Sequence, residues 1–231
     1  MSVENKFSVI IPLREGSKGL PNKNIRILND KPLYLHAVDL AKQANSDRII
    51  LSTNIKEILN SQLDASIELL NRPNEISTDS TEMSPVLIHA IEELSISGTV
   101  VLLQATSPLR SLKDLNKSLE LFENSGSDIV LSVTSADSGV LKWGELSTEG
   151  IFKPLSENKY VFSNRQTLPS ICKPNGAIYI FNAEWLIEKR DLKHAEKISG
   201  IEMPAIRSHD IDTIEDLIIC EKILRNSEEI K

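Results

Sequence analysis

Hydrophobic and polar positions along this chain follow two patterns that take turns. Compact apolar runs, rich in branched residues, have the length of buried strands and lie at 7–13, 47–53, 65–70, 99–104 and 128–134. Between these runs, apolar residues recur every three or four positions, which predicts helices over 32–45, 55–59, 87–94 and 112–122. Strand-helix units with short connections predict an α/β fold, in which a mainly parallel, twisted sheet carries helices on both faces.

The alternation fails between Ser135 and Cys172, where Gly, Ser, Pro and isolated aromatic residues replace regular spacing. A strand at 176–181 restores the pattern, and a helix around Trp185, a strand at 200–206 and a closing helix beyond Thr213 complete it. We therefore expect a single domain over residues 1–231. Within it, we expect an inserted segment at 135–172, built of hairpins, that could cover a substrate or contact a partner subunit.

Composition narrows the class of protein. The chain has 231 residues, enough for one large α/β domain, and its net charge of −7 argues against a nucleic-acid partner. Cys172 and Cys220 have neither metal-ligand spacing nor a disulfide framework, which predicts thiols that serve packing in a reducing compartment. The apolar run at 7–13 is too short for a signal peptide or a membrane span. We expect a cytoplasmic protein without a membrane partner.

A glycine-rich basic loop follows the first predicted strand. Gly16 and Gly19 permit close backbone approach, and Ser17 with the backbone amides can donate to phosphate oxygens. Residues 14–26 hold four basic residues and one acidic residue, in a chain that is acidic as a whole. Ligands of open α/β sheets bind beyond the carboxyl ends of the strands, so the loop is predicted to receive a polyphosphate or a carboxylate. The alternative is a solvated basic turn, and the spacing matches neither the P-loop nor the dinucleotide fingerprint.

Asp210 and Asp212 form a second candidate feature. In an extended segment, side chains at i and i+2 share a face, and paired carboxylates suit a divalent cation that prefers oxygen ligands. Alternatively, one aspartate caps the closing helix and the other is solvated. A nearby phosphate loop favours the metal site, because Mg²⁺ normally bridges protein carboxylates and substrate phosphates.

Other polar residues carry no such signal on their own. The sequence Lys173-Pro174-Asn175-Gly176 has the composition of a turn, Arg165 is typical of an exposed charge, and Arg72 is typical of a strand end. Covalent hydrolase chemistry has no support, because a recognisable nucleophile turn with histidine and acid partners is missing from the sequence.

Four segments, taken in order, resemble the signatures of one family. They are Arg14-x-x-Ser17-Lys18-Gly19-x-x-x-Lys23-Asn24, Gln104-Ala105-Thr106-Ser107-Pro108-Leu109-Arg110, Arg165-Gln166 with Lys173-Pro174-Asn175-Gly176-Ala177-Ile178-Tyr179, and Asp210-Ile211-Asp212. The family is that of the acylneuraminate cytidylyltransferases, or CMP-sialic acid synthetases. Its members transfer CMP from CTP to the anomeric hydroxyl of a nine-carbon keto-sugar acid and release pyrophosphate. The resemblance implies a Rossmann-like nucleotidyltransferase fold, with N-acetylneuraminate or a related nonulosonic acid as the second substrate.

The resemblance also implies roles for individual residues. Catalysis would rest on Arg14, Lys23 and Asp212, with Lys23 stabilising the charge on the departing pyrophosphate. CTP would be held by Arg14, Ser17, Lys18, Lys23, Asn24, Arg72 and Thr81. The sugar-acid pocket would be lined by Gln104, Arg165, Lys173, Asn175 and Tyr179. Mg²⁺ would be held by Asp210 and Asp212, and the inserted segment would form a homodimer in which one subunit closes the other's site.

The sequence departs from the family pattern in three places, of which Lys173 and residues 191–199 bear on the sugar and Ala105 is a local matter of the backbone. Lys173 stands where many relatives have arginine, Ala105 replaces a proline, and residues 191–199 lack an aromatic pair that packs the N-acetyl group in some relatives. The alternatives are activation of legionaminate, pseudaminate or a Kdo-like acid. A catalytically silent sugar-nucleotide binding protein, or a structural α/β module, remains the alternative of another class.

Overall fold

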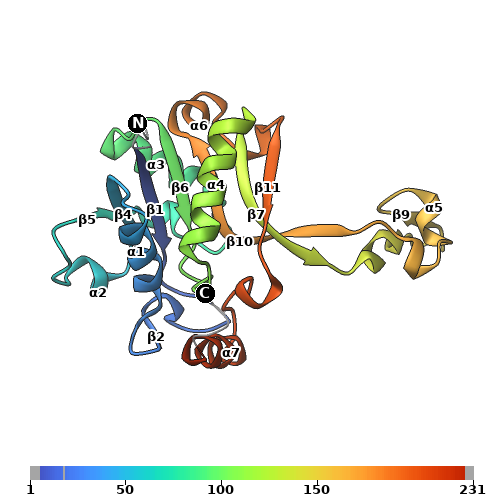
Figure 1. Cartoon of the computed structure of the whole chain (residues 1–231), viewed down its shortest axis with the longest axis horizontal. Helices are drawn as coiled ribbons and strands as arrows, with labels where there is room; N and C mark the ends of the chain where they lie inside the picture. The colour runs from blue at the N-terminus through green and yellow to red at the C-terminus, as the bar shows by residue number, and fades with distance from the viewer. Residues whose placement is uncertain (1–5, 18, 227–231) are drawn as a thin grey trace.

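One sheet forms the centre of the body (Figure 1). The computed structural model describes residues 6–17 and 19–226. Within these residues, the sheet has seven strands in the order β11-β7-β10-β6-β1-β4-β5. Their bounds are β1 Phe7–Leu13, β4 Arg48–Thr53, β5 Ile67–Asn71, β6 Thr99–Leu103, β7 Ile129–Ala136, β10 Ile171–Asn182 and β11 Ile198–Glu202. All pairings are parallel except those of β10, which runs antiparallel to β6 and β7. The predicted, mainly parallel sheet is confirmed.

Helices cover both faces of the sheet, as predicted. The larger ones are α1 Leu33–Gln43, α3 Met83–Leu94, α4 Leu112–Ser125, α6 Ala183–Lys189 and α7 Ile214–Arg225, and α2 Lys56–Leu59 is a single turn. Val9 and Ile11 of β1 pack in the core that contains residues of α1 and α4, whereas Ile10 packs in the core that contains residues of α3 and α6. This division follows from the alternation of side chains along a strand that is buried on both faces.

Helix boundaries reflect local capping. Ser111 accepts a hydrogen bond from the backbone N–H of Asp114, whose side chain accepts from the backbone N–H of Ser111 in return, so a capping box starts α4. Thr213 and Asp216 form the same motif at the start of α7. The helix predicted from Leu87 begins earlier, at Met83, because Pro85 in its first turn is compatible with helix geometry.

The segment that interrupts the sequence pattern forms an arm. β7 and β10 continue outward together, with Ala136 opposite Ile171, and project from the body (Figure 1). Beyond them lie the antiparallel hairpin of β8 Gly144–Leu146 and β9 Phe152–Pro154, and the short helix α5 Asn158–Val161. The turn expected around Lys173 is instead a shift of register inside β10, between Pro174 and Tyr179. The strand therefore begins earlier than the predicted 176–181.

Helix α7 closes the carboxyl edge of the sheet. Ile211, Leu217 and Cys220 pack with Leu20 and with Leu28 of the small hairpin β2 Ile27–Leu28 and β3 Lys31–Pro32. Burial raises the pKa of the Cys220 thiol to about 12, which fits a packing role. Cys172 is exposed, so the packing role predicted for it is wrong. In the described part of the chain, no helix is both long and apolar enough to cross a membrane.

Candidate functional site

A cavity of about 260 Å³ lies where the carboxyl ends of the parallel strands meet. Its walls come from the loop after β1, the end of β5, the start of α3, the turn after β6 and the segment before α7. The lining residues are Pro12, Arg14, Ser17, Lys23, Asn24, Arg72, Ile76, Thr78, Thr81, Met83, Val86, Gln104, Thr106, Asp210 and Asp212. Segments nearly two hundred positions apart in the sequence therefore share one site.

The basic loop is braced by its own polar groups. Asn24 is buried, and its Nδ2 atom donates to the backbone oxygen of Arg14 at 3.0 Å. The backbone N–H of Glu15 donates to Oδ1 of Asn54 at 2.9 Å, which ties the loop to the end of β4. Gly16 has a φ of 78°, a conformation that glycine adopts without strain. Ser17 faces the cavity from this loop, and Lys18 lies outside the described residues.

Close contact joins the loop to the second aspartate. A Cβ atom built on Gly19 would lie 2.5 Å from the backbone oxygen of Asp212, closer than atoms can approach, so only glycine fits there. Four residues further on, the Nζ atom of Lys23 donates to Oδ1 of Asp212 at 2.7 Å. Glycine and lysine of one loop thus fix the backbone and the side chain of the same aspartate.

Two arginines, one in the basic loop and one after β5, add positive charge to the cavity. Arg14 forms an ion pair of 2.6 Å with Asp79. Arg72 is buried and donates to the backbone oxygen of Leu13 at 2.8 Å and to the hydroxyl of Ser77 at 3.0 Å, both uncharged acceptors. Burial, with a smaller contribution from the charge of Arg14, lowers the pKa of Arg72 to about 10. A buried guanidinium beside a second arginine favours an anionic ligand.

Asp210 lines the same cavity as the arginines and is held by the turn after β6. The backbone N–H of Ile211 donates to the backbone oxygen of Thr106 at 2.9 Å, and the Thr106 side chain hydrogen-bonds to the Asp210 carboxylate. Desolvation raises the pKa of Asp210, and the charge of Asp212 acts in the same direction, against the hydrogen bond from Thr106. Two carboxylates that disfavour each other's charge are an arrangement that a cation relieves.

These two aspartates fit a divalent metal ion that keeps open coordination positions. Among the described residues, no group of three or more His, Cys, Asp or Glu side chains could hold a metal by itself. Mg²⁺ typically binds through one or two carboxylates and completes its shell with water and substrate phosphates. The chemistry of the donor set therefore fits Mg²⁺ that completes its coordination with water or with phosphate oxygens of a ligand.

The residues predicted for the sugar acid do not share one cavity. Gln104 lines the cavity, and a Cβ atom on Gly176 would lie 3.6 Å from its Oε1 atom. Tyr179 is half-buried on β10, where burial and the charge of Asp210 raise its pKa. Asn175 is buried beneath the site, outside the cavity lining. Lys173 is exposed on β10 and Arg165 lies on the arm, paired at 3.2 Å with Asp137. One chain thus brings together the residues predicted for CTP and metal, except the undescribed Lys18, but not those predicted for the sugar acid.

Sequence reasoning gave no role to two residues that build the site. Thr106 lines the cavity and supports Asp210. Arg110 is buried, and its Nη1 atom donates to the backbone oxygens of Gln104 and Ser107 at 2.7 Å and of Ala177 at 3.2 Å. Arg110 thereby joins the turn after β6 to the bend of β10. The sequence signal for both residues is the polar segment that directly follows the strand predicted at 99–104.

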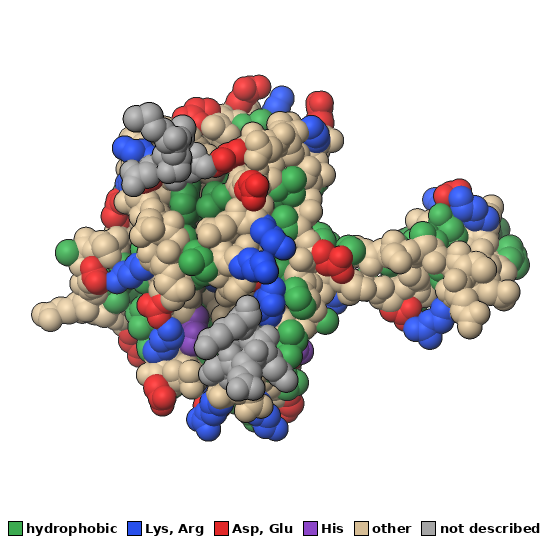
Figure 2. Space-filling model, viewed as in Figure 1, with side chains coloured by type: hydrophobic (Ala, Val, Ile, Leu, Met, Phe, Trp, Pro, Cys, Tyr) green, Lys and Arg blue, Asp and Glu red, His purple; other side chains and the backbone are tan. Residues whose placement is uncertain are grey.

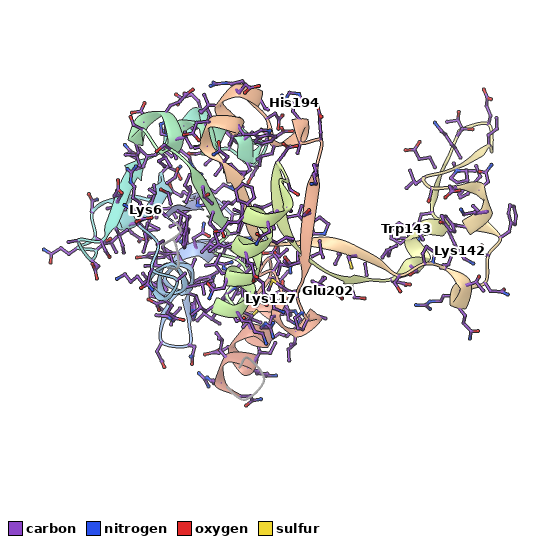
Figure 3. The ribbon with its side chains drawn as sticks, turned by 45° about the horizontal axis from the view of Figure 1, so that its top comes forward. Lys6, Lys117, Lys142, Trp143, His194 and Glu202 are labelled. Atoms are coloured by element: carbon purple, nitrogen blue, oxygen red, sulfur yellow. The ribbon has the colours of Figure 1, made fainter. Side chains whose placement is uncertain are left out.

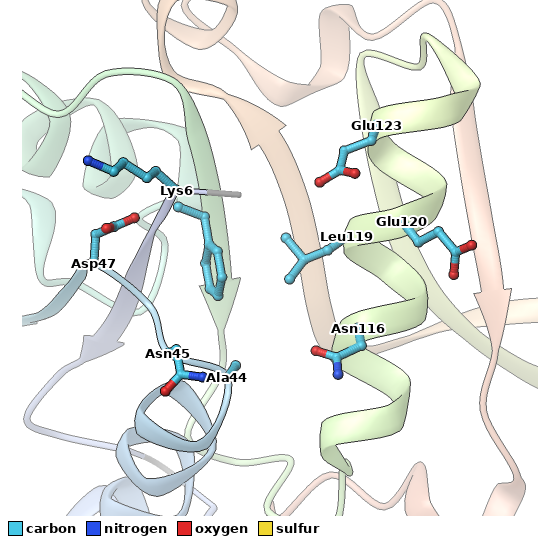
Figure 4. A pocket seen from close by; sticks show the side chains of 9 residues that line it. Lys6, Ala44, Asn45, Asp47, Asn116, Leu119, Glu120 and Glu123 are labelled. Atoms are coloured by element: carbon cyan, nitrogen blue, oxygen red, sulfur yellow. The ribbon is translucent and has the colours of Figure 1, made fainter. Parts of the chain in front are cut away.

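A second hollow, of about 440 Å³, lies at the opposite edge of the sheet (Figure 4). Leu119 and Asn116 of α4 face Ala44 and Asn45 at the end of α1 across it. Although this hollow is larger, it lies at the amino ends of the strands and lacks the arginine pair and the basic loop. The smaller cavity is therefore the better candidate for chemistry.

The fold and the cavity define a nucleotide-transferring class of α/β protein. A solved structure of CMP:2-keto-3-deoxy-manno-octonic acid synthetase in complex with CTP superimposes with a TM-score of 0.71. The alignment covers 96% of this chain and 100% of that chain at 16% sequence identity, which establishes the shared fold alone. The chain belongs to the cytidylyltransferase family, whose model matches residues 8–230.

Curated relatives agree with this assignment. The chain is 30% identical over 214 residues to the N-acylneuraminate cytidylyltransferase of Streptococcus agalactiae serotype V, with 90% of this chain aligned. It spans only 51% of that relative's length. It is also 30% identical to the CMP-N,N'-diacetyllegionaminic acid synthase of Legionella pneumophila, and this alignment covers 97% of this chain and 98% of the relative.

Proposed function

We propose that this chain is a nonulosonic-acid cytidylyltransferase, with N-acetylneuraminate or a close relative as its acid. The cavity that combines Arg14, Lys23 and Arg72 with the carboxylates Asp210 and Asp212 carries the proposal. Cations suit a triphosphate, and the aspartate pair suits the metal that accompanies it. Family membership and the names of the relatives are the reasons for proposing CTP as the nucleotide and a nonulosonic acid as its acceptor.

In the proposed reaction, the anomeric hydroxyl oxygen of the sugar acid attacks the α-phosphorus of CTP. The bond from the α-phosphorus to the bridging oxygen breaks, pyrophosphate leaves with the electron pair, and the hydroxyl proton passes to a base or to solvent. Arg14 and Ser17 would hold phosphate oxygens, and Lys23 would neutralise the charge on the leaving pyrophosphate. Positioning of the two substrates supplies the rest of the acceleration.

The nucleoside end of CTP would lie against the part of the cavity that Arg72 and Thr81 line. Thr81 and the turn before it would contact the cytidine, and Arg72 would donate from the floor. Asn24 lines the cavity and braces the basic loop through its hydrogen bond to the backbone oxygen of Arg14. Lys18 completes the set proposed for CTP. Mg²⁺, held by Asp210 and Asp212, would neutralise phosphate charge as a Lewis acid.

The proposal also covers the identity of the acid and the residues that would contact it. Gln104 and Tyr179 would contact it from β6 and β10, while Lys173 would face its carboxylate as a point charge rather than a bidentate fork. N,N'-diacetyllegionaminate is the second candidate, favoured by the relative from Legionella pneumophila that matches over nearly its whole length.

We propose a homodimer built through the inserted segment at 135–172. Large hydrophobic side chains are exposed along the arm, namely Trp143, Leu146, Ile151, Phe152, Leu155 and Phe162. The arm extends away from the body with these apolar surfaces uncovered, and Trp143 lies on it far from the core (Figures 2 and 3). Exposed apolar patches of this kind mark interaction sites. In a second copy, Arg165 would reach the sugar-acid pocket that one chain leaves incomplete.

The test is the initial rate of pyrophosphate release from CTP and Mg²⁺ with a panel of acids. The panel contains N-acetylneuraminate, N,N'-diacetyllegionaminate, a pseudaminate and Kdo, each compared with a reaction without acid. We expect one nonulosonic acid to give the highest kcat/KM. CTP binding by calorimetry without turnover on any acid would instead favour a sugar-nucleotide binding protein.

A further inference from the structure

The side chain of Asn175 has no hydrogen-bonding capacity left for a ligand. Its Oδ1 atom accepts from the hydroxyl of Ser132 at 2.5 Å and from the backbone N–H of Ala177 at 3.1 Å. Its Nδ2 atom donates to the hydroxyl of Ser208 at 2.9 Å and to the sulfur of Met203 at 3.4 Å. An amide offers two acceptor positions and two N–H groups, and here all four are used.

The position of Asn175 in the fold explains why these partners are available. It lies in the register shift of β10, where the residues between Pro174 and Tyr179 bulge out of the ladder with β7. Ser132 of β7 accepts from the backbone N–H of Ile178 at 2.9 Å, while its own hydroxyl donates to Asn175. The side chain of Asn175 therefore points into the protein and holds the bulge in shape.

The other end of this network reaches the aspartate pair. Ser208 accepts from Asn175, and its hydroxyl donates to the backbone oxygen of Pro204 at 3.0 Å, which closes the 3-10 helix Ala205–Arg207. Two residues further on is Asp210, and the next backbone N–H is bound to Thr106. The segment that carries Asp210 is thus anchored on one side by Asn175 and on the other by Thr106.

We propose that Asn175 is a positioning residue that holds Ser208, and through it Asp210, and does not contact the sugar acid. The inference rests on the proposed function, because it concerns the same site. It predicts that loss of Asn175 weakens the binding of CTP in the presence of Mg²⁺. A residue that contacted the sugar acid would instead raise the KM for the acid.

The test is a double-mutant cycle over Asn175→Ala, Ser208→Ala and the double variant. CTP affinity is measured by calorimetry with Mg²⁺ and with EDTA, and KM for the acid and kcat are measured separately. We expect each single variant to lose about fivefold in CTP affinity with Mg²⁺, little with EDTA, and the double variant to lose no more than the worse single variant. Ser208→Thr, which keeps the hydroxyl, should retain the affinity of the native chain.

A matched control breaks a hydrogen bond between two serine hydroxyls that do not line the cavity. Ser127, which precedes β7, and Ser199 of β11 hydrogen-bond at 2.7 Å, so Ser127→Ala should leave CTP affinity unchanged. A silent Ser208→Ala, together with an Asn175→Ala variant that changes only the KM for the acid, would overturn the inference. If the native chain binds CTP without turnover, the proposed function is contradicted, but the calorimetric double-mutant cycle still tests the inference about Asn175. If the native chain does not bind CTP, both the proposed function and the inference are contradicted.

Discussion

Lys23 and Asp212 lie 189 positions apart in the sequence and form a hydrogen-bonded ion pair of 2.7 Å. The two side chains therefore neutralise each other's charge across the cavity. In the proposed reaction, phosphate oxygens would offer Lys23 a partner of opposite charge, and a metal ion would offer one to Asp212. Both residues would then act on the same phosphate chain.

The first prediction concerns this pair. Lys23→Ala and Asp212→Asn should each reduce kcat by about 10²-fold to 10³-fold, the usual cost of losing a group that stabilises developing charge. Because Asp212 is 69% exposed, the ion pair itself should contribute less than about 1 kcal/mol to the free energy of unfolding. Steady-state kinetics and urea unfolding measure the two effects. The exposed pair of Lys42 and Asp64, 2.8 Å apart, supplies the control, and Lys42→Ala should keep the native kcat.

The second prediction concerns the contact between Gly19 and Asp212. Gly19→Ala places a methyl group against the Asp212 backbone oxygen, so the loop and the aspartate segment have to separate. We expect a loss of CTP affinity with Mg²⁺ of about tenfold or more, measured by calorimetry. Gly200→Ala on β11, whose added Cβ would make only ordinary contacts at 3.5 Å, is the control. Native affinity in Gly19→Ala would contradict the close packing of these two segments.

The third prediction is a pH dependence of stability. Burial of Asp114 acts to raise its pKa, but hydrogen bonds from Arg207 and Ser111 outweigh it and hold the pKa below the usual value. The unfolded chain then binds this proton more tightly, so the stabilisation is present above about pH 4 and is lost as the pH falls through the lowered pKa. Asp114→Asn should cost about 3 kcal/mol at pH 7 and less at pH 3, where the stabilisation has begun to be lost. Urea unfolding at both pH values measures this, and an equal loss at both would exclude the ion pair as its cause.

The fourth prediction concerns the arm. Phe162 is 89% exposed and Trp143 is 64% exposed, so replacing both with serine should leave the body folded and weaken association between copies. Light scattering after size-exclusion chromatography should find a dimer for the native chain and a monomer for the variant. Ile27→Ser, at an exposed apolar residue of the body, is the control and should stay dimeric. A native chain that is monomeric at micromolar concentration would contradict the proposed dimer.

The sequence could predict that several candidate residues lie around one cavity, for a simple physical reason. Arg14 and Gln104 each follow a parallel strand, and strand ends of this kind meet at one edge of the sheet. Asp210 joins them because the closing helix packs on the same edge. Topology alone was therefore sufficient to place these residues together.

The positions of Asn175 and Arg165, which were predicted for the sugar acid, could not be predicted in the same way. The direction of Asn175 depends on a register shift in β10, and the local composition of a turn gives no sign of it. The antiparallel direction of β10 depends on the path of the chain through the arm, which periodicity does not reveal. Arg165 is carried away from the cavity by that same arm, where it pairs with Asp137, so in the proposed homodimer it would reach the site of a second copy.

The most direct test of the central proposal is a ³¹P NMR measurement of CTP, Mg²⁺ and the acid that gives the highest rate in the panel. The proposed reaction predicts pyrophosphate and a CMP ester of the acid in equal amounts, with the α-phosphorus recovered as a phosphodiester. It also predicts that CTP stays intact when the acid is left out. Unchanged CTP with every acid, or release of free CMP and pyrophosphate at the same rate without acid, would contradict it.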